Sequence, residues 1–308
     1  MNKLQKFGKS LWKDRTLVLM ALPAVIILIM FSYVPMTGLV LAFKRFDYSK
    51  GLYGSPWCGL KNFQQLFTVG DTFWRMTKNT IMYYLLFTIT GVIAEIAIAL
   101  GISELYFKKT AKYLHSGMIL PTFISSVALS YIVAAVLDKK TGMLNHMIAS
   151  FGGNTINFYL SADYWPLILT IVNLWCCSGY GSVLYLSALS GIDQELYEAA
   201  ALDGAGTFKR IRYITIPMLI PMVSIKLLLG LGGIMNSNTG YFYQVTKNSG
   251  ALYKTTQVLD SYVLNSIKKS GDYGATSAVT FYQSTVGCFM LVTVNLIVKK
   301  ISPENSLF

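Results

Sequence analysis

Residues 190–206 read SGIDQELYEAAALDGAG and lie between two long apolar runs. Asp193 can cap a helix here, because its carboxylate accepts the N–H groups of the first turn. Glu195 favours the positive end of that helix, and Ala199–Ala201 are strong helix formers. Gly204 follows where a helix end favours a left-handed residue. The stretch predicts a helix of two to three turns in a loop between two apolar segments.

The flanking composition places this loop in a membrane protein. Of the 308 residues, 54% are hydrophobic and 13% are charged, whereas soluble proteins average about 25% charged residues. A chain with so few charges cannot cover a soluble surface, so soluble enzymes are excluded. Six windows have the ~20 apolar residues that a spanning helix needs: Leu17–Phe43, Thr80–Leu105, Leu114–Leu137, Tyr164–Leu189, Ile214–Met235 and Ala278–Val298. We expect an all-α, polytopic fold with six transmembrane helices.

The basic residues predict the orientation of these helices. With the N-terminus inside, the inner segments hold 13 Lys and Arg in 58 positions and the outer segments hold 12 in 104. This excess places both termini in the cytoplasm, although six of the outer positives lie in the first outer loop. The first run follows the basic residues Lys3, Lys6, Lys9, Lys13 and Arg15 and is too long for a cleaved signal. It is therefore predicted to be a retained helix.

The predicted organisation is one membrane domain. Residues 1–16 form a cytoplasmic leader, 17–298 the six-helix domain with its inner loop at 190–217, and 299–308 a cytoplasmic tail. Residues 60–67 have helical periodicity and predict a short helix on the membrane surface. A second short helix is expected to start after the inner loop, with Thr207 as its cap.

The net charge of +12 fits membrane orientation better than nucleic-acid binding, because the basic residues lie mostly between apolar runs. Two histidines and four scattered cysteines make a zinc site or a disulfide framework improbable. The chain has no phosphate-binding GxxxxGK[ST] loop. Any ATP and Mg²⁺ are therefore expected on other subunits, with no catalytic residue or cofactor in this chain.

The inner loop resembles the EAA loop of binding-protein-dependent ABC importer permeases. The run Glu198-Ala199-Ala200 is followed at the family's spacing by Gly204, Ile214 and Ile216-Pro217, with Ile216 where the family usually has Leu. Gly59-Leu60-Lys61-Asn62-Phe63 and Leu202-Asp203-Gly204-Ala205 are similar to the maltose-type carbohydrate permeases. Short distal motifs resemble the LplB-type branch for complex oligosaccharides: Gly232-Gly233, Asp260-Ser261-Tyr262-Val263, Gly271-Asp272-Tyr273 and Ser306-Leu307-Phe308.

The resemblance implies a MetI-like, type I importer permease in the bacterial cell membrane. Its implied partners are a second permease, two cytoplasmic ATPase subunits, an extracytoplasmic solute-binding protein, a carbohydrate and membrane lipid. The resemblance implies that ATPase coupling involves Glu198, Ala199, Ala200, Asp203, Gly204 and Pro217. We expect Gly204→Asp or Glu198→Lys to uncouple transport. The residues alone leave open that the helix only packs on the chain's own helix ends.

Sugar contacts are expected from polar and aromatic side chains in the central spans. The candidates are Ser125, Ser126, Tyr131, Asn173, Trp175, Tyr180, Lys226, Asn236, Ser237, Asn238, Tyr241 and Tyr243. For each residue, helix–helix hydrogen bonding or an interfacial aromatic belt is the alternative. Glu95 and Lys226 are charges at membrane depth and must face protein or water. Lys226 therefore has two interpretations, path wall or ion pair, and for Glu95 the ion pair is favoured.

Two other functional classes compete with an ABC permease. An ion-coupled secondary transporter would carry several carboxylates within its spans and often internal repeats, whereas only Glu95 lies well inside one. A membrane enzyme would need a cluster of His, Cys or acidic residues. Within the ABC class, a small polar solute resembling glycerol phosphate is the alternative substrate.

Overall fold

A computed structural model describes residues 14–68, 70–105 and 107–301. Most of the predicted leader, with Lys3, Lys6, Lys9 and Lys13, lies outside these residues, as does the motif Ser306-Leu307-Phe308. Within the described residues no strand forms, and the only extended pairing is an isolated bridge between Lys44 and Trp57. The all-α prediction is therefore confirmed.

Among the described residues, five continuous helical stretches are long and apolar enough to cross a membrane: Arg15–Phe43, Asp71–Ser103, Ala162–Ser190, Thr207–Leu231 and Tyr273–Lys300. They correspond to five of the six predicted windows. The predicted third window, Leu114–Leu137, is not one helix, because the segments Lys108–Phe123 and Ser126–Leu137 meet at a bend of 102°. Pro121 and an extended Ile124 end the first segment, and Ser125 caps the second. Hydropathy alone cannot detect such a change of direction.

The chain divides into two compact units, residues 1–68 with 270–281 and residues 69–269 with 282–308. The first unit contains α2 (Arg15–Leu28), the π-helix η1 (Ile29–Tyr33), α3 (Val34–Met36), the 3₁₀-helix η2 (Thr37–Phe43), α4 (Gly51–Gly54) and α5 (Lys61–Thr68). Helix α16 (Tyr273–Ile301) begins in the first unit and continues into the second.

The second unit carries the central spans and the inner loop. Its longer helices are α6 (Asp71–Ser103), α7 (Lys108–Ile119), α8 (Ser126–Leu137), α9 (Met143–Ser150), α10 (Trp165–Ser190), α11 (Gln194–Leu202), α13 (Ile216–Leu231) and α15 (Leu259–Ser270). Its short segments are η3 (Leu120–Phe123), η4 (Phe158–Leu160), η5 (Ala162–Tyr164), α12 (Thr207–Arg210), the π-helices η6 (Ile211–Thr215) and η7 (Gly240–Val245), η8 (Gly250–Leu252) and α14 (Tyr253–Thr256).

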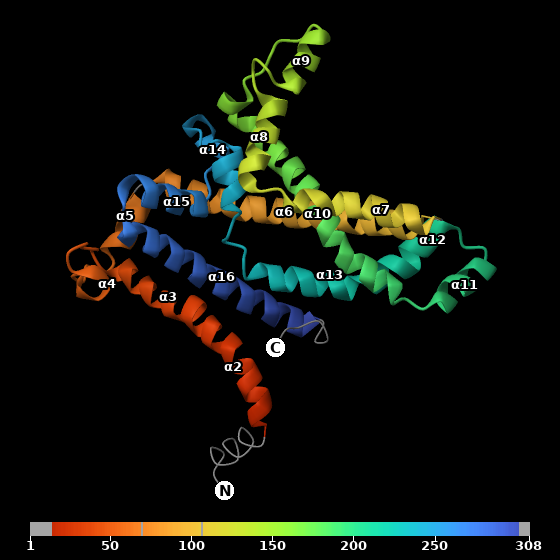
Figure 1. Cartoon of the computed structure of the whole chain (residues 1–308), viewed down its shortest axis with the longest axis horizontal. Helices are drawn as coiled ribbons and strands as arrows, with labels where there is room; N and C mark the ends of the chain where they lie inside the picture. Colours follow the sequence, from red (N-terminus) through yellow and green to blue (C-terminus); the bar gives the residue numbers. More distant parts are fainter. Residues whose placement is uncertain (1–13, 69, 106, 302–308) are drawn as a thin grey trace. The chain divides into compact units, whose positions relative to one another are not determined.

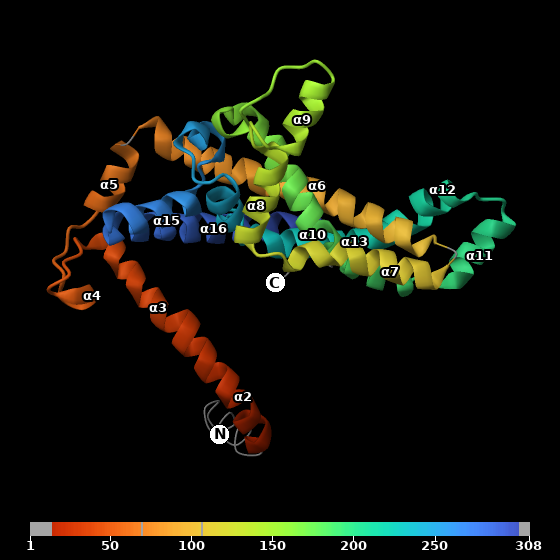
Figure 2. The ribbon, with the colours of Figure 1, turned by 45° about the horizontal axis from the view of Figure 1, so that its top comes forward.

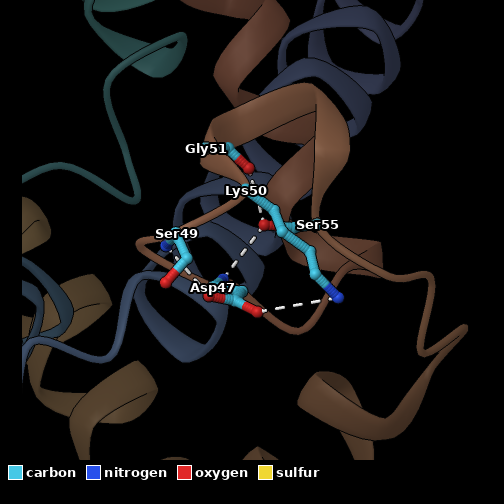
Figure 3. Close-up of polar contacts among 5 residues, drawn as sticks. All are labelled: Asp47, Ser49, Lys50, Gly51 and Ser55. Carbon is cyan, nitrogen blue, oxygen red and sulfur yellow. Dashed lines mark hydrogen bonds and ion pairs between the residues drawn. The ribbon is translucent and has the colours of Figure 1, made fainter.

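In the first unit, the predicted short helix at 60–67 is confirmed as α5. The Asn62 side-chain amide donates to the carbonyl oxygens of Ala42 and Lys44 at 2.9 and 3.0 Å, which fixes α5 against the end of η2. The loop after η2 closes on itself through the Asp47 carboxylate and the Ser55 hydroxyl, which accepts the Asp47 N–H at 3.0 Å (Figure 3). The Asp47 carboxylate also accepts the Ser49 N–H at 2.9 Å, so these local hydrogen bonds hold the loop together.

The core of the second unit lies among α6, α8, α10 and η7 (Figures 1 and 2). Tyr83, Leu129, Trp165 and Phe242 are fully or almost fully buried there, one from each of these elements. The Trp165 indole N–H donates to the Phe158 carbonyl oxygen at 2.7 Å. Large, fully buried side chains from four elements therefore form the core that holds this unit together.

Helices α7 and α10 approach closely along a row of small residues on α10. The row is Cys176, Gly179 and Ser182, spaced so that all three lie on one face. A Cβ on Gly179 would collide with the Met118 carbonyl oxygen, and the Thr122 hydroxyl donates to the Cys176 carbonyl oxygen at 2.6 Å. In a membrane, small residues and such hydrogen bonds hold helices together in place of the hydrophobic effect.

Candidate functional site: the inner loop and the central spans

The ends of α11 form as the sequence predicts. The Asp193 carboxylate accepts the N–H two residues further on at 3.0 Å and caps the helix. Gly204 has φ +74°, a left-handed conformation that other residues adopt only with strain. The N–H of Gly204 donates to Ala201 at 3.0 Å and that of Ala205 to Ala200 at 2.8 Å. These two bonds are the pair that defines a Schellman motif, so Gly204 ends α11 and turns the chain.

Helix α11 lies beyond one end of the bundle of α6, α7, α10 and α13, where it has few neighbours (Figures 1 and 2). All of its residues are described and none is buried. Glu198, Ala199, Asp203 and Gly204 are exposed, and Leu202 is 90% exposed. The alternative in which this helix packs mainly on the chain's own helix ends therefore does not describe the structure.

The Tyr197 side chain ties α11 to the fifth span. The Tyr197 hydroxyl lies 3.0 Å from the Thr215 hydroxyl, and Thr215 is buried at the start of the fifth span. The contact joins the middle of α11 to η6, directly before α13. A displacement of α11 would therefore be transmitted through this contact to the start of α13.

The segment after the loop corrects one prediction. Thr207 does not cap a separate helix, because Gly206 holds the cap position and the helix continues unbroken from Thr207 to Leu231. Pro217 is accommodated by the π-helix η6, which lies directly before α13. A proline lacks an N–H and clashes with the carbonyl four residues earlier, and a wider turn relieves that clash.

Within the spans, Glu95 on α6 forms an ion pair with Lys226 on α13. The side chains are 9% and 32% exposed. Gly181 on α10 makes room for the pair, because a Cβ there would collide with the Glu95 carboxylate. The Lys226 ammonium also lies 5.4 Å from the centre of the Tyr185 ring. The pairing alternative for these two charges is thus confirmed, and it links three helices.

The other predicted substrate-path residues lie in separate places. Ser125 caps α8 by accepting the N–H of Ala128 at 3.2 Å. The loop after α13 meets this end of α8, since a Cβ on Gly240 would collide with the Ser126 hydroxyl. Asn238 accepts the Gly240 N–H at 2.9 Å. Ser125 and Asn238, distant in sequence, therefore flank one junction.

The remaining predicted residues do not share that junction. Trp175 lines a cavity of about 650 Å³ among α6, α7, η3 and α10. Tyr241 is 5% exposed, and its hydroxyl lies 3.5 Å from the Cys177 sulfur. The alternative of helix–helix hydrogen bonding therefore describes Tyr241. The side chains of Tyr131, Tyr180 and Asn236 are exposed, and that of Asn173 is half-buried.

Three features of the site escaped prediction. The His115 ring nitrogen Nε2 lies 2.9 Å from the Ser182 hydroxyl and joins α7 to α10. Gly181 admits Glu95, and Tyr197 anchors α11. The run Ser178-Gly179-Tyr180-Gly181-Ser182 is the one available signal, because several small residues in one span indicate close helix packing. Nothing local in the sequence marks the Tyr197 contact.

Comparisons with known proteins define the class. The protein-family model for the binding-protein-dependent transport system inner membrane component matches residues 90–303 of this chain. The chain belongs to this family, so the resemblance drawn from the inner loop is confirmed, and the family is a permease component rather than a catalytic one.

Particular relatives cover nearly the whole chain. Two proteins of Bacillus subtilis strain 168 are each 30% identical over 96% of this chain: the polygalacturonan/rhamnogalacturonan transport system permease protein YteP, over 91% of its length, and Protein LplB, over 92%. A solved bacterial ABC transporter involved in the import of the acidic polysaccharide alginate matches with a TM-score of 0.86 and 29% identity, covering 96% of this chain and 99% of that one. A solved bacterial alginate ABC transporter in complex with an alginate pentasaccharide-bound periplasmic protein matches with a TM-score of 0.85 and 28% identity, covering 96% of this chain and 97% of that one.

Proposed function

We propose that this chain is the permease subunit of an ATP-driven importer for oligosaccharide fragments of acidic polysaccharides. It would form half of a membrane path with a second permease, receive sugar from an extracytoplasmic binding protein, and be driven by two cytoplasmic ATPase subunits that bind ATP and Mg²⁺. The names of YteP and of the alginate transporter support the substrate class. The basic-residue asymmetry supports a cell-membrane location with both termini cytoplasmic.

The observation that carries this proposal is the exposure of α11. A capped helix with an exposed alanine, an exposed glutamate and a fully exposed leucine offers a partner a small, close-fitting surface. Alanine side chains allow another backbone to approach closely. Burial of the Leu202 side chain against a partner would stabilise the complex, because apolar surface would be removed from water. We assign this surface to the ATPase, with Glu198 as its polar anchor and Gly204 as its turn.

The same contacts describe how movement would pass into the membrane. An ATPase that displaces α11 acts on α13 at two points, the Gly204 turn that leads into α12 and the Tyr197–Thr215 contact. Helix α13 is held to α6 by the Glu95–Lys226 pair. We therefore expect α11, α13 and α6 to move together as one rigid body. Such a rigid-body movement is what a path that opens alternately to the two sides of the membrane requires.

For the sugar path we retain five exposed polar and aromatic residues, which come from α8 and its cap, from α10 and from the loop after α13. They are Ser125, Tyr131, Tyr180, Asn236 and Asn238. Hydroxyl and amide groups there can hydrogen-bond sugar hydroxyls, and aromatic rings can stack on sugar faces. Tyr241 is left out because it is buried, and Lys226 because Glu95 neutralises it.

The test uses the complete transporter in proteoliposomes with its loaded binding protein. Gly204→Val places a β-branched residue at φ +74° and should uncouple uptake from ATP hydrolysis, whereas Gly204→Asn should retain coupling because asparagine tolerates this conformation. Glu198→Lys should uncouple in the same way, and Glu195→Gln on the same helix should not. Equal coupling in Gly204→Val and Gly204→Asn, with ATPase subunits present at the same ratio, would remove the role of α11.

The substrate class is tested separately in the same vesicles. Uptake of a trigalacturonate should exceed uptake of the neutral maltotriose when the matched binding protein is present. Uptake of the neutral sugar alone would refute the acidic substrate while leaving the coupling role intact.

A further inference from the structure

A cavity of about 570 Å³ opens where the inner ends of three spans meet the start of α11. Its walls come from the end of α6 at Ser103, the first two turns of α7, the end of α10 at Ser190, and Gln194, the first residue of α11. All of these belong to the second unit. The cavity therefore lies at the level where apolar helices emerge from the membrane, beside the helix assigned to the ATPase.

The lining combines positive charge with apolar surface. Lys108, Lys112 and His115 lie on one face of α7 at helical spacing. None of the twelve described residues that line the cavity carries a carboxylate, and neither lysine has an ion pair within the described part of the chain. Leu186 and Leu189 of α10 supply an apolar wall beside these cations. A lining that combines cations with leucines matches a ligand that is anionic at one end and apolar at the other.

We propose that this cavity binds the headgroup of an anionic phospholipid. Lys108 and Lys112 would contact the phosphate oxygens, the Ser116 hydroxyl would donate a further hydrogen bond, and the acyl chains would lie along α10. Basic pockets between spanning helices are known to hold such headgroups. The proposal rests on the proposed function only in naming this leaflet cytoplasmic.

The competing explanation is that these lysines only contribute to a general attraction for the inner leaflet. The chain offers a matched control for it. Lys109 lies next to Lys108 on α7 but does not line the cavity, and Lys209 lies on α12. The variants Lys108→Gln/Lys112→Gln and Lys109→Gln/Lys209→Gln remove equal charge from the same side of the protein, but only the first pair removes it from the cavity.

The experiment measures bound lipid on the detergent-purified complete transporter by native mass spectrometry, with phosphatidylglycerol titrated against phosphatidylcholine of the same acyl chains. Each lysine near an anionic headgroup is worth about a factor of five in binding. The cavity variant should therefore lose roughly 30-fold in phosphatidylglycerol affinity relative to phosphatidylcholine, and the control variant should change less than about twofold.

Three results would overturn the proposal: equal losses in both variants, no preference for phosphatidylglycerol in the native protein, or displacement of the bound lipid by millimolar inorganic phosphate, which would indicate a site for a free anion. A fourth result would also overturn it: loss of the ATPase subunits from the cavity variant, with lipid binding unchanged, would assign the cavity to that partner instead. None of these readouts depends on sugar uptake, so failure here is distinguishable from failure of the proposed function.

Discussion

Removing either member of the Glu95–Lys226 pair should destabilise the protein, and unequally. Breaking a buried ion pair costs about 3–5 kcal/mol, because the remaining charge is left buried alone. Lys226→Met leaves a carboxylate that is only 9% exposed, so we expect about 3 kcal/mol. Glu95→Gln leaves an ammonium that is 32% exposed and faces the Tyr185 ring. Because a lysine can extend its head toward water, the cost there should fall to about 2 kcal/mol.

The double variant Glu95→Gln/Lys226→Met distinguishes the interaction energy of the pair from the cost of losing each charge alone. Replacing both charges by neutral groups of similar size is often close to neutral, so the double should cost about 1 kcal/mol or less and not the sum of the singles. Glu104→Gln, at the exposed C-cap of α6, is the control for charge removal and should stay within about 0.5 kcal/mol.

Unfolding of the purified transporter in increasing denaturant, followed by a probe on the second unit, gives the four free energies of this cycle. Equal costs for the two single variants would contradict the assigned exposures. Additive costs in the double would mean that the two groups do not interact, and the ion pair would then no longer explain how α6 is joined to α13.

Three further outcomes follow from single contacts. Tyr197→Phe removes the hydroxyl that reaches Thr215, worth about 1 kcal/mol, and should lower the uptake per ATP hydrolysed without changing complex yield; an unchanged ratio would show that this contact transmits nothing. Gly179→Leu would drive a side chain into the Met118 carbonyl and should reduce membrane yield, while full yield would disprove the close approach of α7 and α10. The Asp138 carboxylate accepts the N–H groups two and three residues on, and these bonds hold its pKa below the ordinary value. The stability that the ionised Asp138 lends to this turn should therefore be complete above pH ~4 and should be lost as the pH falls through the lowered pKa. Protease cleavage of the turn at pH 7 and pH 3, compared with cleavage of the Asp138→Asn variant, measures this loss. Cleavage of the native protein that does not depend on pH would refute the prediction.

Features that depend on neighbouring residues in sequence could be predicted. Both ends of α11 follow from side chains within a few positions, the Asp193 cap and the left-handed Gly204. Five spanning helices follow from unbroken apolar length. The family pattern then identified the class, because its spacing is set by this same loop.

Features that depend on distant contacts could not be predicted. In a membrane protein the apolar pattern does not distinguish a helix face that meets protein from one that meets lipid, since both are apolar. The sequence therefore placed Trp175 and Tyr241 in one path, whereas the structure puts one at a cavity against α7 and the other in the core. The break at Ile124 was missed for a related reason, because composition records length and not direction.

The pairing of Glu95 with Lys226 also bears on how an acidic sugar could be selected. A single cation in the path would attract an anionic glycan strongly, but it would also hold it, and release would be slow. In the described central spans the ammonium is neutralised by a carboxylate that Gly181 admits beside it. Selection would then fall to the binding protein and to uncharged hydrogen-bonding groups. Lys226→Met should accordingly lower stability and yield, while the uptake ratio of trigalacturonate to maltotriose per transporter stays constant; a fall in that ratio would place the lysine in the path after all.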